Sequence, residues 1–161
     1  NARVWTVAIP PSGLYVIGLV GLPLPLPIDV RVSRAANQLV LNNTDTNMSF
    51  DTEGYDHGGW WTTGAPTDII APYAGKVVVA AELTFTGNAT GFRAIRIMQN
   101  GGFQWEHRVP SIGSSAMPIT IVGDLTVDAG DIITLNALQT SGISLNTTGF
   151  AVAYYRGALH P

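Results

Sequence analysis

Cysteine is absent from the 161-residue chain, and charged residues are scarce. Without cysteine the chain has no disulfide framework, no thiolate metal site and no thiol nucleophile. Asp, Glu, Lys and Arg together make up 12% of the residues, against about 25% in ordinary soluble domains. Disordered segments combine low hydrophobicity with high charge, so the hydrophobic fraction of 46% excludes disorder for most of the chain.

Basic residues are few, with eight Lys and Arg in all, a single lysine at Lys76 and a net charge of −3. Nucleic acids and anionic membranes are bound by clustered Lys and Arg, so we expect neither as a partner. Scarce charge also leaves much of the surface without the groups that normally keep proteins apart. We therefore expect part of the surface to be buried in an oligomer or a larger assembly.

The longest apolar stretch, residues 13–28, is not a membrane-spanning helix. Pro23, Pro25 and Pro27 interrupt it, and proline removes a backbone donor and forbids a continuous helix. The stretch also lacks the basic segment and small-residue cleavage pattern of a secretory signal. The chain begins at Asn1 rather than Met, which we expect to reflect processing, trimming or excision from a longer protein.

Helical periodicity is nearly absent, and short alternating runs separated by Gly, Pro, Asn and Asp predict an all-β sandwich or barrel. In the clearest run, residues 76–85, one face is apolar from Val77 to Phe85. The other face is mostly small or apolar as well, so we expect it to be covered too. Further strands are expected at residues 92–99, 104–109, 118–122, 125–127, 132–140 and 150–155, with weaker candidates at 37–41 and 48–50. Asn100-Gly101 after the second run predicts a hairpin turn.

The first 36 residues differ in kind from the rest. Leu22, Leu24 and Leu26 alternate with three prolines, which predicts an extended polyproline-like strap that cannot pair as a central strand. Two interpretations stay open: the strap docks against a partner, or it packs along its own domain. Short strands at 4–9 and 14–20 and clean alternation at 28–32 flank the strap.

Several short motifs follow one another between residues 37 and 155 in a set order. They are Phe50 to Asp56, Ile69 to Val77, Gly91 to Ile97 with Asn100-Gly101, Ala129 to Leu135, Gln139 to Gly142, and Phe150 to Tyr155. Their order and spacing resemble the tumour-necrosis-factor and complement-globular-head jelly-roll superfamily, and look closest to its branch among bacteriophage structural proteins. Nothing resembles the collagen stalk of animal complement-type heads, and the Leu-Pro strap in its place favours the phage setting.

The resemblance implies a jelly-roll β-sandwich of about ten strands that assembles as a tight homotrimer. We expect an N-terminal arm at 1–36 that the fold does not need, a jelly-roll domain at 37–156 and a tail at 157–161. In such a trimer one face of the closing strand meets the neighbouring subunits. Tyr beside small residues suits close approach, so Tyr155, Ala153 and Ala151 are predicted at the trimer interface and Phe150 in the core.

Catalysis needs titratable groups that converge, and the sequence offers none in a recognisable pattern. His57, His107 and His160 are scattered along the chain, and Ser114 and Ser115 lack the Gly-x-Ser-x-Gly pattern of a nucleophile elbow. We therefore expect no enzyme activity, no catalytic residue and no cofactor.

Asp51, Glu53 and Asp56 form the densest acidic cluster, with His57 beside them. Carboxylates bind hard cations such as calcium, but this spacing matches no EF-hand loop. A solvated turn built from Asp and Gly is the favoured interpretation, so no metal site is predicted.

Trp60 and Trp61 follow two glycines. In an extended chain the two rings point in opposite directions, so at least one is expected to leave the core and make an external contact with a neighbouring protein or a glycan. The alternative is a loop that folds back and buries both rings.

These observations lead to one leading hypothesis and one alternative. The first is a non-enzymatic virion structural protein, a trimeric knob on the surface of a bacteriophage capsid or tail, with the arm docking to capsid or tail proteins. The alternative is a trimeric head module that binds a host-surface receptor or glycan.

Overall fold

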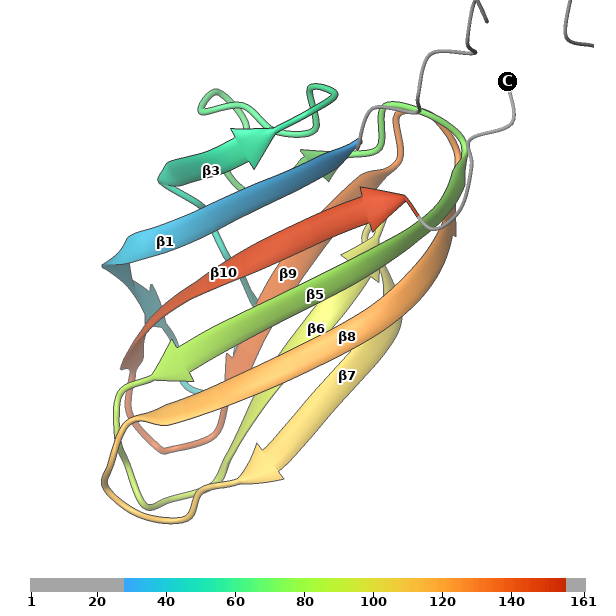
Figure 1. Cartoon of the computed structure of the whole chain (residues 1–161). Helices are drawn as coiled ribbons and strands as arrows, with labels where there is room; N and C mark the ends of the chain where they lie inside the picture. The colour runs from blue at the N-terminus through green and yellow to red at the C-terminus, as the bar shows by residue number, and fades with distance from the viewer. Residues whose placement is uncertain (1–27, 156–161) are drawn as a thin grey trace, which may run out of the picture.

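Ten strands form two facing antiparallel sheets within residues 28–155, the part of the chain that the computed structural model describes (Figure 1). In chain order they are β1 (Asp29–Val40), β2 (Thr46–Asn47), β3 (Thr52–Asp56), β4 (Ile69–Ile70), β5 (Gly75–Phe85), β6 (Phe92–Gln99), β7 (Gly102–Pro110), β8 (Met117–Val127), β9 (Ile132–Gln139) and β10 (Leu145–Tyr155). One sheet has the order β3-β1-β10-β5-β8, and the other has β2-β9-β6-β7 with β4 also pairing β9. No helix occurs between residues 28 and 155, so none there is long and apolar enough to cross a membrane. The predicted all-β sandwich is confirmed.

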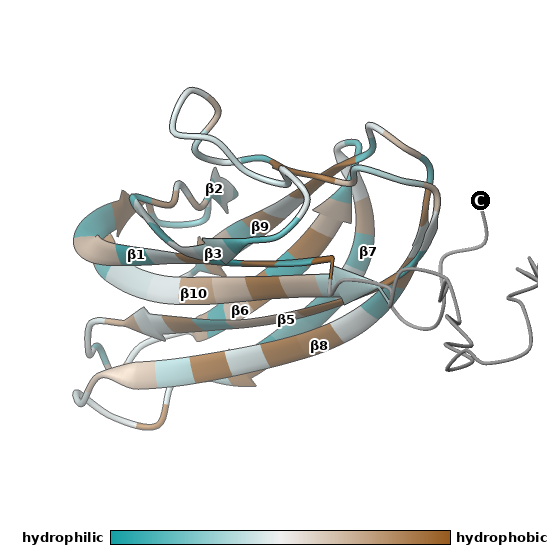
Figure 2. Cartoon of the chain, turned by 45° about the horizontal axis from the view of Figure 1, so that its top comes forward, coloured by the Kyte–Doolittle hydropathy of each residue, from teal (hydrophilic) through white to brown (hydrophobic). Residues whose placement is uncertain are grey.

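The inward faces of both sheets fill one apolar core. Along β8 every second residue from Ile119 to Val127 is buried while the residues between are exposed, and Figure 2 shows the resulting bands of hydropathy. Alternation of period two places these side chains on one face of the strand. The predicted inner face of β5, from Val77 to Phe85, is buried in the same way. The facing sheet contributes fully buried isoleucines such as Ile95 and Ile97.

β8 is one continuous strand where two short ones were predicted, at 118–122 and 125–127. The sequence suggested that Gly123 and Asp124 interrupt the strand, but both residues pair with β5. A Cβ on Gly123 would lie 2.4 Å from the Trp105 ring, so glycine here makes room for an indole that crosses from β7. That indole donates its Nε1 hydrogen to the Asp124 carbonyl oxygen over 3.1 Å, which ties the edges of the two sheets together.

The predicted boundary between an arm ending at 36 and a domain starting at 37 falls inside β1. Val30 pairs with Ala153 and Val32 pairs with Ala151, and both valines are completely buried. The clean alternation at 28–32 is therefore the first half of a core strand, interrupted by a register shift between Arg34 and Gln38 rather than by a domain boundary. Residues 29–36 belong to the sandwich. The strap leucines at 22, 24 and 26 and the tail at 157–161 lie outside the described residues.

Candidate functional site

The outward side of the β3-β1-β10-β5-β8 sheet carries a continuous group of apolar side chains, here called the apolar face. Its members are Val78 and Ala80 on β5, Val122 on β8, and Phe150, Val152 and Tyr154 on β10. Val152 pairs with Ala80, which pairs with Val122, and Tyr154 pairs with Val78. Because paired residues in neighbouring strands lie side by side, the six form one patch across three strands.

The apolar face is not needed to fill the core of the protomer. Val122 is 67% exposed and Tyr154 is 43% exposed, while residues that alternate with them point into the sandwich and are buried. Apolar patches on a single soluble domain mark surfaces that bind a partner. The sequence-based expectation that the second face of residues 76–85 is covered points to this same surface.

The predicted interface residues Ala151, Ala153 and Tyr155 lie on the opposite side of β10, and for the two alanines that prediction is wrong. Ala151 and Ala153 are completely buried in the core, and Phe150, predicted as a core residue, lies on the outer side. Both sides of this strand are apolar, so no polar residue marked which one faced outward. Ala151 and Ala153 join the same core as larger side chains such as Trp60, which comes from the loop after β3.

Tyr155 anchors the end of β10 to its own protomer. Its hydroxyl donates to the Tyr73 carbonyl oxygen and accepts the Tyr73 backbone N–H over 2.9 Å. Its ring centroid lies 5.1 Å from that of Trp60. Burial raises the pKa of Tyr155, against the opposing effect of the Tyr73 hydrogen bond. These contacts give Tyr155 a stabilising role within its own protomer.

Trp60 and Trp61 are both buried, with exposed fractions of 0% and 8%, so the predicted external contact is wrong and the loop folds back instead. The Asp56 carboxylate accepts the backbone N–H groups of Gly59, Trp60 and Trp61, each over 2.9 Å. These bonds turn the chain sharply, helped by the positive φ of 75° at Gly59. Because the chain turns here and is not extended, the Trp60 and Trp61 rings need not point to opposite sides, and both lie in the core.

The acidic cluster predicted from the sequence does not converge in space. Asp56 binds the tryptophan loop, whereas Asp51 accepts the N–H groups of Ala35 and Ala36 over 3.1 and 3.2 Å. These hydrogen bonds, led by the one from Ala35, hold the pKa of the Asp51 carboxyl below its usual value despite partial burial. Within residues 28–155 no three His, Asp or Glu side chains are grouped so as to hold a metal ion.

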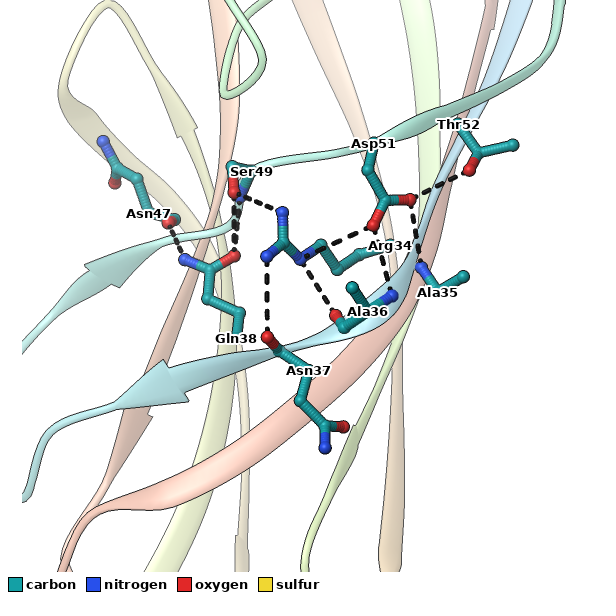
Figure 3. A network of polar contacts seen from close by, with 9 residues as sticks. All are labelled: Arg34, Ala35, Ala36, Asn37, Gln38, Asn47, Ser49, Asp51 and Thr52. Carbon is teal, nitrogen blue, oxygen red and sulfur yellow. Dashed lines mark hydrogen bonds and ion pairs between the residues drawn. The ribbon is translucent and has the colours of Figure 1, made fainter.

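Asp51 belongs to a polar network that holds the irregular middle of β1 (Figure 3). Arg34 donates to the Ser49 hydroxyl over 3.1 Å, and Ser49 donates its backbone N–H to Gln38 over 2.9 Å. Gln38 in turn donates to the Asn47 carbonyl oxygen over 2.7 Å. The network compensates for strand pairing lost at the register shift, which is a structural role.

The histidines and serines that were considered for catalysis lie apart. His57 Nδ1 is 2.6 Å from an Asp29 carboxylate oxygen, and His107 Nδ1 is 2.6 Å from the Thr120 carbonyl oxygen. Ser114 and Ser115 are exposed in the loop before β8, and His160 lies outside the described residues. The described residues therefore bring no nucleophile and base together.

No family model and no curated protein matches the chain. Among solved structures, the globular domain of zebrafish complement 1qA superposes with a TM-score of 0.65 at 10% identity, over 81% of this chain and 98% of that one. The Eiger TNF of S. frugiperda superposes with a TM-score of 0.58 at 10% identity, over 84% and 96% of the two chains. At this identity the likeness concerns the fold alone, and neither structure is a phage protein. The sandwich thus has the jelly-roll fold of tumour-necrosis-factor and complement globular heads.

Proposed function

We propose that this protein is a non-enzymatic, self-associating head domain that forms a homotrimer through its apolar face. The observation that carries the proposal is a six-residue apolar patch on a sheet whose other side already fills the core. The low charge fraction of 12% supports it, because a protomer with a surface covered by neighbours needs fewer solubilising groups. The expectation of three subunits in the assembly comes from the superfamily that the sequence resembles.

The second part of the proposal concerns the particle to which the trimer is attached. We place it on the surface of a bacteriophage capsid or tail, on the strength of the motif resemblance described above. In this setting residues 1–27, which include Leu22, Leu24 and Leu26, dock the head to capsid or tail proteins. The alternative function is a trimeric head that binds a host-surface receptor or glycan; Trp60 and Trp61 are buried in the protomer, so they do not supply its contact surface.

The assembly is tested by light scattering coupled to size exclusion on the full chain. We expect a mass of three times 17.0 kDa at micromolar concentration. A stable 17.0 kDa monomer across that range would overturn the proposal.

The virion setting is tested separately, by mass spectrometry of purified phage particles whose genome encodes this chain. Detection of the chain in the particles supports the virion setting, and its absence from them contradicts it.

A further inference from the structure

The turn between β6 and β7 contains the only asparagine of the chain that is followed by glycine, Asn100-Gly101. Both residues are exposed and have positive φ values, 51° and 75°, as in a type I′ hairpin turn. Among the described residues, no atom lies within 4 Å of the place where a Cβ would stand on Gly101, so this side of the turn is open. Asparagine loses its side-chain amide most readily before glycine, because no side chain there hinders attack by the next backbone nitrogen.

Asn100 joins this turn to the start of β9 through three hydrogen bonds, here called the latch. Its side-chain Nδ2 donates to an Asp131 carboxylate oxygen over 2.7 Å, and its Oδ1 accepts the Ile132 backbone N–H over 2.9 Å. Its own backbone N–H donates to the Ile132 carbonyl oxygen over 2.8 Å. Both polar atoms of the side chain are therefore held, and the latch extends the pairing of β6 with β9 beyond Gln99.

Asp131 is held in place independently of Asn100. Its other carboxylate oxygen accepts Gln99 Nε2 over 2.7 Å and the Asp128 backbone N–H over 2.9 Å. These hydrogen bonds, led by the one from Asn100, hold the pKa of the Asp131 carboxyl below its usual value. Hydrogen bonds to an ionised acceptor are stronger than those between neutral groups, so Asp131 is a firm anchor for the Asn100 amide.

Deamidation would begin with attack of the Gly101 backbone nitrogen on the side-chain carbonyl carbon, Cγ, of Asn100. A C–N bond forms, the bond from Cγ to Nδ2 breaks, and ammonia leaves with the proton of the Gly101 N–H. Water then opens the resulting succinimide ring at either of its two carbonyl carbons, which gives aspartate or isoaspartate. Closing the ring rotates the peptide between the two residues away from its orientation in the type I′ turn, so the latch must break first.

We infer that Asn100 is a deamidation site that the latch protects in the folded chain, and that its conversion to aspartate or isoaspartate breaks the latch for good. The product carries a carboxylate where Nδ2 donated, so two carboxylates would meet without a hydrogen between them. Like charges at hydrogen-bond distance repel each other, and Asp131 keeps its other donors, so the turn is the part that moves. The inference is independent of the proposed self-association.

The rate of deamidation in the full chain tests the protection. Trypsin releases residues 97–108, which contain a single asparagine, so mass spectrometry follows the loss of the Asn100 amide in mildly alkaline buffer. We expect the folded wild type to react at least about tenfold more slowly than a synthetic peptide of the same residues, because a hydrogen bond to a charged acceptor must break first. Asp131→Ala removes that acceptor and should speed the reaction about tenfold.

Asp128→Ala is the matched control, because it removes a carboxylate from the same turn, and the Asp128 side chain makes no hydrogen bond within residues 28–155. It should leave the rate unchanged. Circular dichroism at the incubation temperature establishes that each chain is folded. A wild type that deamidates as fast as the peptide would overturn the protection, and so would a folded Asp131→Ala chain that reacts at the wild-type rate.

Exchange of the amide and the carboxylate tests whether deamidation breaks the latch. Asn100→Asp imitates the product and should lower the melting temperature by about 3–8 °C. Adding Asp131→Asn exchanges the two groups, so an amide again donates to a carboxylate and the melting temperature should return close to that of the wild type. If Asn100→Asp melts like the wild type, or if the double variant melts no higher than the single one, the claim that deamidation breaks the latch is wrong.

Discussion

Replacing Val152 with arginine should convert the assembled protein into folded monomers. Val152 lies in the middle row of the apolar face, between Arg31 and Ala80 in register. An arginine there is solvated in the free protomer but would be buried without a partner in the assembly, which costs about 3–5 kcal/mol in each contact. Light scattering should therefore report the mass of one chain, and circular dichroism should show an unchanged β spectrum.

A control on the opposite side of the same strand separates assembly from folding. Tyr155→Phe removes the hydroxyl that bonds the Tyr73 backbone, so the free energy of unfolding should fall by about 1–3 kcal/mol for two lost hydrogen bonds. Its assembly should match that of the wild type at temperatures where both are folded. If Val152→Arg stays assembled while Tyr155→Phe dissociates, the two sides of β10 have been assigned incorrectly.

A chain that begins at residue 33 should fail to fold, whereas a chain that begins at residue 28 should fold. The shorter chain loses Val30 and Val32, each completely buried, and the backbone pairing of the first half of β1 with both β10 and β3. Burying one valine contributes about 1.5–3 kcal/mol, and the lost strand pairing adds to this. Domains of this size are stable by only about 5–15 kcal/mol in total.

Thermal unfolding followed by circular dichroism distinguishes the two truncated chains. We expect a cooperative transition for the chain starting at residue 28 and none for the chain starting at residue 33. Equal melting temperatures would mean that the first half of β1 is dispensable, in line with the sequence-based expectation that the fold does not need the N-terminal arm. Failure of the longer chain to fold would show that residues 1–27 contribute to the core.

The sequence was most informative where one side of a strand is polar or a turn has a special conformation. Strict alternation predicted β5, and Asn100-Gly101 predicted the hairpin between β6 and β7, where both residues have positive φ values of 51° and 75°. The apolar second side of β5 also indicated a covered surface. These features depend on local residue patterns, which a single sequence contains.

The errors occurred where the outcome depends on partners distant in the sequence. Ala151 lies opposite Ala81 of β5, an inward residue, and only this register decides which side of β10 faces the core. The burial of the Trp60 side chain depends on the turn that the Asp56 carboxylate stabilises by accepting the Trp60 backbone N–H. The predicted domain boundary between residues 36 and 37 was wrong because β1 continues through a register shift that local alternation does not reveal. The apolar face itself became visible only when β10, β5 and β8 were placed side by side.

Thiol labelling at Val122 tests burial of the apolar face most directly. The chain lacks cysteine, so Val122→Cys carries a single thiol at a position that is 67% exposed in the protomer. Ile112→Cys, at a loop position that is 89% exposed, supplies the reference rate. At concentrations where the protein is assembled, we expect the thiol at 122 to react much more slowly than the thiol at 112, and to lose this protection when Val152→Arg is added. Equal rates at the two positions in the assembled protein would contradict the account, because the apolar face would then be open to solvent.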